Sequence, residues 1–197
     1  MSVELETPRL LLRQWKEADF EAYAAYYADP QLAKYVGGQA PREGAWRRMA
    51  TLIGHWALRG YGYWAVEEKR TGILAGCVGL WFSDGWPELE LGYWLVPDAQ
   101  GRGYATEAGL VARDYAWNSV GTESLVSYID PGNEPSKRVA ERLGASFEST
   151  IDLLTYGPHC VFRYPRPRTH APWPTRTRRP PTRPSPSTTP RNTCSSS

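Results

Sequence analysis

The sequence predicts a mixed α/β fold in which helices lie on the faces of one sheet. Segments with strand-like and helix-like periodicity follow one another along the chain in the order β-α-α-β-β-β-α-β-α-β-β. Turn-forming residues separate these segments, and 41% of the 197 residues are apolar, which is enough for the core of one domain. We therefore expect one domain over residues 1–164 and a separate tail over residues 165–197.

The first elements are predicted to be one strand and two helices. Residues 9–15 form the strand, with three consecutive leucines at its centre. Residues 16–27 carry apolar side chains at helical spacing and stop before Asp29-Pro30, because a residue that precedes proline disfavours the helical conformation. Residues 41–59 form the second helix, and Pro41 suits its first turn.

The middle of the chain predicts three strands and a helix. Residues 63–68 and 73–82 form a hairpin across a four-residue turn that ends at Gly72. A third strand follows over residues 88–96, and a helix over residues 104–119. Small side chains on one face of this helix allow it to approach a sheet closely; they are Ala105, Ala108, Ala112 and Ala116.

The last part of the domain predicts a strand, a helix and two more strands. The strand covers residues 125–129 and the helix residues 135–143. Gly144 follows directly, which is typical of a glycine that ends a helix. Residues 146–154 and 159–164 complete the predicted sheet.

The tail over residues 165–197 is rich in Pro, Arg, Ser and Thr. Eight of the 23 Lys and Arg residues follow residue 162, whereas the last of the 21 acidic residues is Asp152. A segment of this composition buries too little apolar surface to offset its loss of entropy, so we expect it to be disordered. Its charge alone could attract nucleic acid, but no nucleic-acid partner is expected.

The other bulk features favour a cytoplasmic protein without a metal centre. Cys77, Cys160 and Cys194 are odd in number, and their spacing matches no metal motif. The first 20 residues lack the apolar stretch of a signal peptide, and no apolar run approaches 18 residues. We therefore expect no membrane partner.

The segment from Gln100 to Thr106 carries the clearest chemical pattern. It joins a predicted strand to a predicted helix, and Gly101 and Gly103 allow main-chain N–H groups to point in one direction. The start of a helix adds unpaired donors and a positive dipole end, which favour phosphate. The dinucleotide pattern G-x-G-x-x-G and the P-loop pattern are both missing. A glycine turn that merely joins the two elements is the alternative.

Four motifs occur in an order and spacing that are specific in combination. They are Thr7-Pro8-Arg9-Leu10-Leu11-Leu12-Arg13, Glu90-Leu91-Gly92-Tyr93, Gly101-Arg102-Gly103-Tyr104-Ala105-Thr106-Glu107-Ala108, and Asn133-Glu134-Pro135-Ser136 followed by Arg142-Leu143-Gly144. Together they resemble the RimJ/RimL-like branch of the GNAT N-acetyltransferases, over roughly residues 5–164. The resemblance implies the GNAT fold, with a mixed, mostly antiparallel central sheet and helices on both faces.

The resemblance implies acetyl-CoA as co-substrate and no metal. The loop that would bind its pyrophosphate consists of Gln100, Gly101, Arg102, Gly103, Tyr104, Ala105 and Thr106. Arg102 would add a charge-assisted contact to a phosphate, or it is a solvated loop charge. The pantetheine arm would lie where the strand with Leu95 and Val96 separates from residues 125–129, and a main-chain N–H near Leu95 or Val96 would polarise the thioester carbonyl.

The resemblance also implies the catalytic residues. Glu90 would remove the proton of the acceptor amine, and Glu88 and Asp152 are alternative carboxylates. A structural or substrate-orienting role for Glu90 stays open. Ser136 would lie near the sulfur and protonate the leaving thiolate, and Asn133 would bind the pantetheine arm. Asn133 is also a suitable N-cap for the helix that follows it.

We therefore expect an acetyl-CoA-dependent N-acetyltransferase that acts directly on a primary amine, either a protein N-terminus or a small molecule. A non-catalytic acyl-CoA-binding module is the alternative. The resemblance is compatible with a homodimer. The expected lining of the acceptor pocket is aromatic, and each residue could instead be ordinary packing: Tyr35, Trp46, Trp56, Tyr61 and Trp86.

Overall fold

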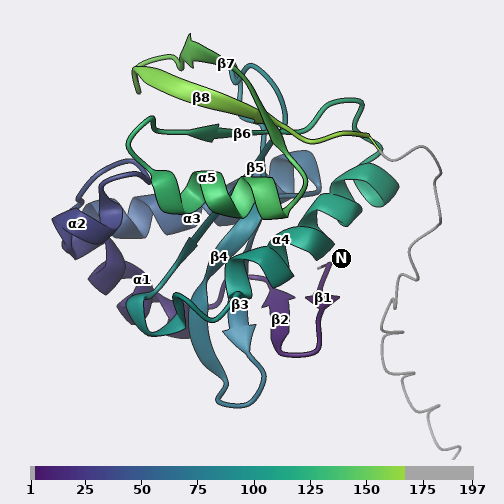
Figure 1. The fold of residues 1–197 in the computed structure, drawn as a ribbon. Coiled ribbons are helices and arrows are strands. Elements are labelled where there is room, and N and C mark those ends of the chain that lie inside the picture. The colour runs from purple at the N-terminus through teal and green to yellow at the C-terminus, as the bar shows by residue number, and fades with distance from the viewer. Residues whose placement is uncertain (1–2, 167–197) are drawn as a thin grey trace, which may run out of the picture.

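The structure is a computed structural model that describes residues 3–166 (Figure 1). The tail predicted from residue 165 lies, from residue 167 onward, outside the described residues. Eight strands form one sheet in the order β1-β2-β3-β4-β5-β6-β8-β7. Their bounds are β1 (Leu5–Glu6), β2 (Leu10–Arg13), β3 (Tyr63–Glu68), β4 (Ile73–Trp81), β5 (Glu90–Leu95), β6 (Val126–Ile129), β7 (Ser146–Asp152) and β8 (Pro158–Arg163). The predicted mixed α/β class with a mostly antiparallel sheet is confirmed.

The pairing of β5 with β6 differs from every other pairing in this sheet. These two strands are parallel, and their ladder consists of one residue pair, Glu90 opposite Val126. The next main-chain acceptor on β5, the carbonyl of Leu91, is bonded by the side-chain hydroxyl of Ser127 instead of a main-chain N–H. Beyond this point the strands separate, so the sheet has a gap in its middle.

Helices cover both faces of the sheet. The α-helices are α1 (Phe20–Ala28), α2 (Pro30–Ala33), α3 (Arg42–Arg59), α4 (Tyr104–Tyr115) and α5 (Glu134–Arg142). In Figure 1, α4 and α5 lie in front of the sheet and α1 to α3 behind it. Each face has its own apolar core: Ala108 and Ala112 of α4 pack in one, and Tyr23 of α1 and Met49 of α3 pack in the other.

The first helix begins later than the sequence predicts. Residues 17–19 form a single 3-10 turn, and α1 begins at Phe20. The carboxylate of Asp19 accepts the main-chain N–H of Lys16 at 2.9 Å and both terminal nitrogens of Arg13 at 2.7 and 2.8 Å. Arg13 also donates to Glu67 at 2.7 Å. This buried ion-pair network fixes the turn and ties β2 to β3.

Other elements also differ from the prediction. The short elements β1 and α2 were not predicted. The strand predicted for residues 9–15 ends at Arg13, and the indole N–H of Trp15 donates instead to the carbonyl of Tyr63 at 3.0 Å. The helix predicted for residues 104–119 ends at Tyr115 and continues to Val120 as a π-helical turn.

Candidate active site

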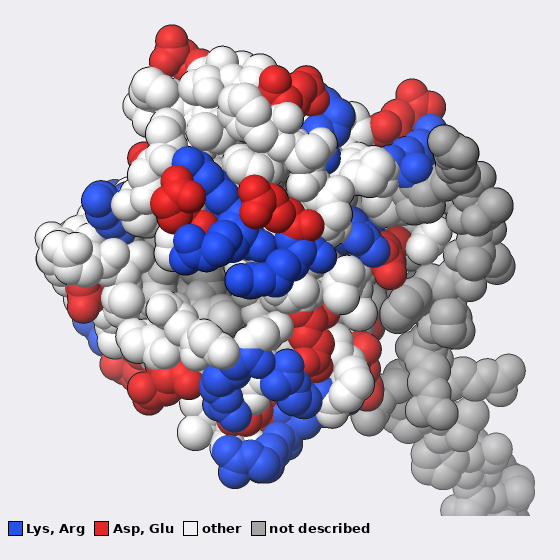
Figure 2. Space-filling model, in the orientation of Figure 1, with Lys and Arg blue, Asp and Glu red and all other residues white. Residues whose placement is uncertain are grey.

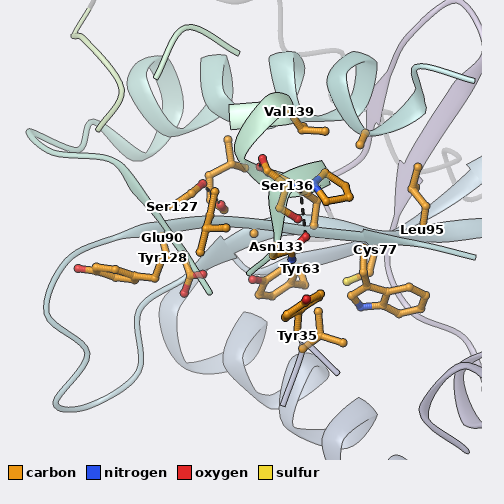
Figure 3. A pocket seen from close by; sticks show the side chains of 18 of the residues that line it. Tyr35, Tyr63, Cys77, Glu90, Leu95, Ser127, Tyr128, Asn133, Ser136 and Val139 are labelled. Carbon is orange, nitrogen blue, oxygen red and sulfur yellow. Dashed lines mark hydrogen bonds between the residues drawn. The ribbon is translucent and has the colours of Figure 1, made fainter. Parts of the chain in front are cut away.

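A large cavity opens where β5 and β6 separate. Its volume is about 1470 Å³, and residues of α1 and α3 line it together with residues of α4 and α5. Because these helices lie on opposite faces of the sheet, the cavity extends through the gap. Figure 3 shows Leu95 at one side of this space, Glu90 and Tyr128 at the other, and Asn133 and Ser136 between them.

The glycine loop borders one end of the cavity. Gly101 and Gly103 adopt positive φ values of 72° and 79°, a conformation that favours glycine. The first main-chain bond of α4 runs from Glu107 to Gly103, so the N–H groups of the three preceding residues have no partner within the helix. Six of the seven predicted loop residues line the cavity: Gln100, Gly101, Gly103, Tyr104, Ala105 and Thr106.

Arg102 is the loop residue that does not line the cavity. Its guanidinium donates to Glu68 at 2.8 Å and stacks 4.7 Å from the centre of the Tyr104 ring. Hydrogen bonds from Tyr104, Thr71 and Arg102 lower the pKa of Glu68 to about 2, so this carboxylate stays charged and holds the arginine. Arg102 is therefore neither free in solvent nor directed into the cavity; it is paired with Glu68.

Two other arginines face the cavity and were not expected from the sequence. Arg138 and Arg142 are one turn apart on α5, and both line the cavity. Neither guanidinium makes an ion pair or hydrogen bond within residues 3–166, whereas the neighbouring Lys137 pairs with Glu134. Figure 2 shows basic side chains gathered over α5 beside a hollow in this face. Their i, i+4 spacing was the only signal available in the sequence.

The main-chain N–H groups of Leu95 and Val96 point to opposite sides of β5. The N–H of Val96 donates to the carbonyl of Ala75 on β4 at 3.0 Å, and Val96 does not line the cavity. Neighbouring N–H groups along a strand point in opposite directions, so the N–H of Leu95 points toward the β6 side. Leu95 lines the cavity, and its carbonyl accepts the side-chain amide of Gln100 at 3.0 Å.

Asn133 and Ser136 lie at the start of α5, and both line the cavity. The side chain of Asn133 accepts the main-chain N–H of Ser136 at 3.3 Å, so the expected N-cap is present. The hydroxyl of Tyr93 on β5 donates to the carbonyl of Ser136 at 2.8 Å. This bond fixes the first turn of α5 over the gap in the sheet.

Glu90 is the carboxyl group at the deep end of the cavity, at the point where the β5–β6 ladder stops. Burial raises its pKa to about 8, although Trp86 and the main chain at Tyr128 partly oppose the shift. The hydroxyl of Tyr128, which also lines the cavity, is buried without a partner in the described part of the chain. A polar ligand can satisfy this hydroxyl.

The two alternative carboxylates lie elsewhere. Glu88 accepts both terminal nitrogens of Arg163 at 2.8 and 2.9 Å, and these hydrogen bonds lower its pKa. Asp152 is exposed at the end of β7 and does not line the cavity. Of the three candidate carboxylates, Glu90 alone lines the cavity.

Aromatic side chains form part of the cavity lining. Of the five residues expected there, Tyr35 and Trp86 line the cavity, whereas Trp56 and Tyr61 do not and Trp46 is 60% exposed on the outside of α3. The lining also contains tyrosines that the sequence did not predict there, and four of them are Tyr23, Tyr26, Tyr27 and Tyr63. They come from one helical face and one strand end, which sequence periodicity assigns to the core.

Within residues 3–166, no group of three or more His, Cys, Asp or Glu side chains could hold a metal ion. No helix in the same part of the chain is long and apolar enough to span a membrane.

Comparisons with known proteins agree in their descriptions. Residues 9–146 match the sequence model of a family described as "Acetyltransferase (GNAT) domain". YkkB of Bacillus subtilis (strain 168) is 31% identical over 75% of this chain and 88% of its own length. The uncharacterized N-acetyltransferase YoaA of the same strain is 25% identical over 77% and 88%. A crystal structure of an acetyltransferase from Agrobacterium tumefaciens str. C58 superposes with a TM-score of 0.75 at 34% identity, over 82% of this chain and 93% of that one.

Proposed function

Since this chain belongs to the GNAT acetyltransferase family, whose members transfer acetyl groups from acetyl-CoA, we propose that it acetylates a primary amine, on a protein N-terminus or a small molecule. We place it in the RimJ/RimL-like branch, because the four sequence motifs of that branch line or adjoin one cavity. The observation that carries the proposal is the gap between β5 and β6, which connects the glycine loop with Glu90.

The residues around this gap fit acetyl-CoA. The main-chain donors at the start of α4 suit the pyrophosphate, and Arg138 and Arg142 add two positive charges on the opposite rim. The N–H of Leu95 and the side chain of Asn133 suit the amide groups of the pantetheine arm or the thioester carbonyl. When bound, acetyl-CoA supplies an acetyl group activated as a thioester.

Glu90 and Ser136 divide the proton transfers between them. As the amine nitrogen bonds to the acetyl carbon, it must lose one proton, and Glu90 accepts that proton directly or through water. As the carbon–sulfur bond breaks, the sulfur gains a proton or a hydrogen bond from the hydroxyl of Ser136. No residue forms a covalent bond to the acetyl group in this scheme.

The decisive experiment measures binding and turnover separately. Calorimetry with coenzyme A tests the cavity, and thiol release with mass spectrometry across a panel of amines and peptides tests transfer from acetyl-CoA. We expect micromolar binding and at least one acetylated amine. Binding without any acetylated product would favour the alternative, a non-catalytic acyl-CoA-binding module, and absence of binding would refute both.

A prediction concerns the arginines of α5. Replacing both Arg138 and Arg142 by Ala is expected to weaken coenzyme A binding by about 30-fold at low salt, because each charge-assisted contact to phosphate contributes about 1 kcal/mol near the surface and the two together about 2 kcal/mol. The loss should shrink as ionic strength rises. Calorimetry at two salt concentrations measures it.

The matched control is Arg102→Ala. Because Glu68 already holds Arg102 away from the cavity, this variant should weaken binding less than the double variant does. An equal or larger loss in Arg102→Ala would mean that Arg102 leaves Glu68 to bind the phosphates.

A further inference from the structure

Three residues lie in one row across the middle of the sheet. Tyr63 on β3 is opposite Gly79 on β4, and Gly79 is opposite Gly92 on β5. The two glycines leave the sheet surface bare on the face that α1 and α3 cover. The side chain of Tyr63 can therefore lie flat across β4 and reach the central strand.

Both glycines lie too close to Tyr63 for a side chain to fit, Gly79 against its main chain and Gly92 against its phenol. A Cβ atom added at Gly79 would lie 2.3 Å from Cα of Tyr63, and one added at Gly92 would lie 1.9 Å from its hydroxyl oxygen. Neither glycine has a positive φ, so close approach explains them and backbone conformation does not. The hydroxyl of Tyr63 thus sits directly over Gly92.

The main chain of Tyr63 is held as firmly as its ring. The β2–β3 ladder ends at Arg13 opposite Ala65 and does not reach Tyr63, the first residue of β3. Beyond the ladder, the carbonyl of Tyr63 accepts the indole N–H of Trp15 at 3.0 Å and that of Trp56 at 2.9 Å. Two large side chains, the buried Trp15 and the half-buried Trp56, therefore set the position of this residue.

The hydroxyl of Tyr63 faces the deep end of the cavity. Glu90 and Gly92 are two residues apart on β5, so they share one face of the sheet. Burial and the nearby charge of Glu90 raise the pKa of Tyr63 well above its ordinary value, so the phenol stays neutral. Its hydroxyl has no hydrogen-bond partner within residues 3–166. In Figure 3 its ring lies between Glu90 and Cys77, below Ser136.

We propose that the hydroxyl of Tyr63 binds the attacking amine and holds it between Glu90 and the thioester. The proposal rests on the proposed function. The phenol oxygen accepts one N–H of the amine, whose lone pair then points at the acetyl carbon. One proton passes from nitrogen to Glu90, and the sulfur leaves with the electron pair of the carbon–sulfur bond. Tyr63 gains and loses no proton, so it orients the nitrogen and is not a second base.

The test is Tyr63→Phe, which removes one oxygen atom and keeps the ring. Steady-state kinetics with an amine found in the panel should give a kcat/KM for the amine that is lower by about 10- to 100-fold, as expected for a misplaced nucleophile. The KM for acetyl-CoA and the dissociation constant of coenzyme A should stay within twofold. Tyr115→Phe, at a buried tyrosine outside the cavity lining, is the control and should leave all three constants unchanged.

A second variant keeps the phenol and moves it. Gly92→Ala places a methyl group where the hydroxyl of Tyr63 lies, so it should also lower the kcat/KM of the amine. In the double variant with Tyr63→Phe, the fold-loss of kcat/KM should be smaller than the product of the two single losses. Circular dichroism confirms that each variant is folded.

The outcomes separate this proposal from the proposed function. If Tyr63→Phe retains the kcat/KM of the amine within twofold, or weakens coenzyme A as much as the amine, then Tyr63 is a structural residue and the proposal is wrong. If the unchanged protein binds coenzyme A but acetylates no amine, the proposed function fails and the role of Tyr63 fails with it.

Discussion

Glu90→Gln is expected to lower kcat for amine acetylation by about 10²- to 10⁴-fold at pH 8, the usual contribution of a general base. Glutamine keeps the size of the side chain and its place at the end of the β5–β6 ladder, but it cannot accept a proton. Coenzyme A binding should change little, because Glu90 lies at the acceptor end of the cavity. Thiol-release kinetics and calorimetry with the same preparation measure the two quantities.

The pH dependence gives this prediction a second readout. Glu90 acts as a base only when ionised, so the kcat of the unchanged protein at saturating amine should rise with pH and level off above about 8, where burial places the pKa of Glu90. The Gln variant should lose that rise. Asp152→Asn removes an exposed carboxylate outside the cavity and should keep the profile of the unchanged protein. A rise that persists in Glu90→Gln would show that another group is the base.

The same group should also influence stability. Because the folded state raises the pKa of Glu90 from 4.5 to about 8, the folded protein holds this proton more tightly than the unfolded chain does. Glu90 therefore lowers the free energy of unfolding as pH rises through this window. Relative to the unchanged protein, Glu90→Gln should become steadily more stable between about pH 4.5 and 8, as urea unfolding at several pH values can measure.

Arg13→Met is expected to lower the free energy of unfolding by about 3–5 kcal/mol, the usual cost of breaking a buried ion pair by removing one partner. The side chains of Arg13 and Asp19 are only 9% and 4% exposed. The substitution leaves the carboxylate of Asp19 without its guanidinium and removes one of the two cations beside Glu67. Urea unfolding followed by circular dichroism measures the loss.

The control for this prediction is Arg42→Ala. Arg42 pairs with Glu21, but both side chains are largely exposed, at 61% and 76%. Exposed pairs contribute about 1 kcal/mol or less, so this variant should be close to the unchanged protein. Similar losses in the two variants would mean that the network around Arg13 is no more important than an ordinary surface contact.

The sequence was sufficient for elements with a strong periodic pattern. The strands β3, β4 and β5 and the helices α3 and α5 begin and end within two residues of their predicted bounds. The elements β1 and α2 are two and four residues long, which is too short for any periodicity to appear. The start of α1 depends on the contact of Asp19 with Arg13, a tertiary interaction that local propensity does not include.

The candidate site was predictable where it consists of consecutive residues. The glycine loop, Glu90 and the turn from Asn133 to Ser136 could be found because local motifs contain them. The row of Tyr63, Gly79 and Gly92 could not, because it exists only once the registers of three strands are known. Arg102 shows the opposite case, a residue whose motif position suggests a role that its contacts do not support. The motif suggests a phosphate contact, but the guanidinium is paired with Glu68.

The single residue pair that joins β5 to β6 affects solubility as well as binding. Unpaired strand edges usually invite pairing with other chains, and proteins keep them short or covered. In this protein the unpaired edges of β5 and β6 face each other inside the molecule. Helix α5 covers them on one face of the sheet, and α1 lies on the other face. A strand from another protein, with side chains on both faces, is too bulky to enter. Only a narrow, flexible ligand can reach these edges. The helices that protect the edges from aggregation therefore also select the ligand.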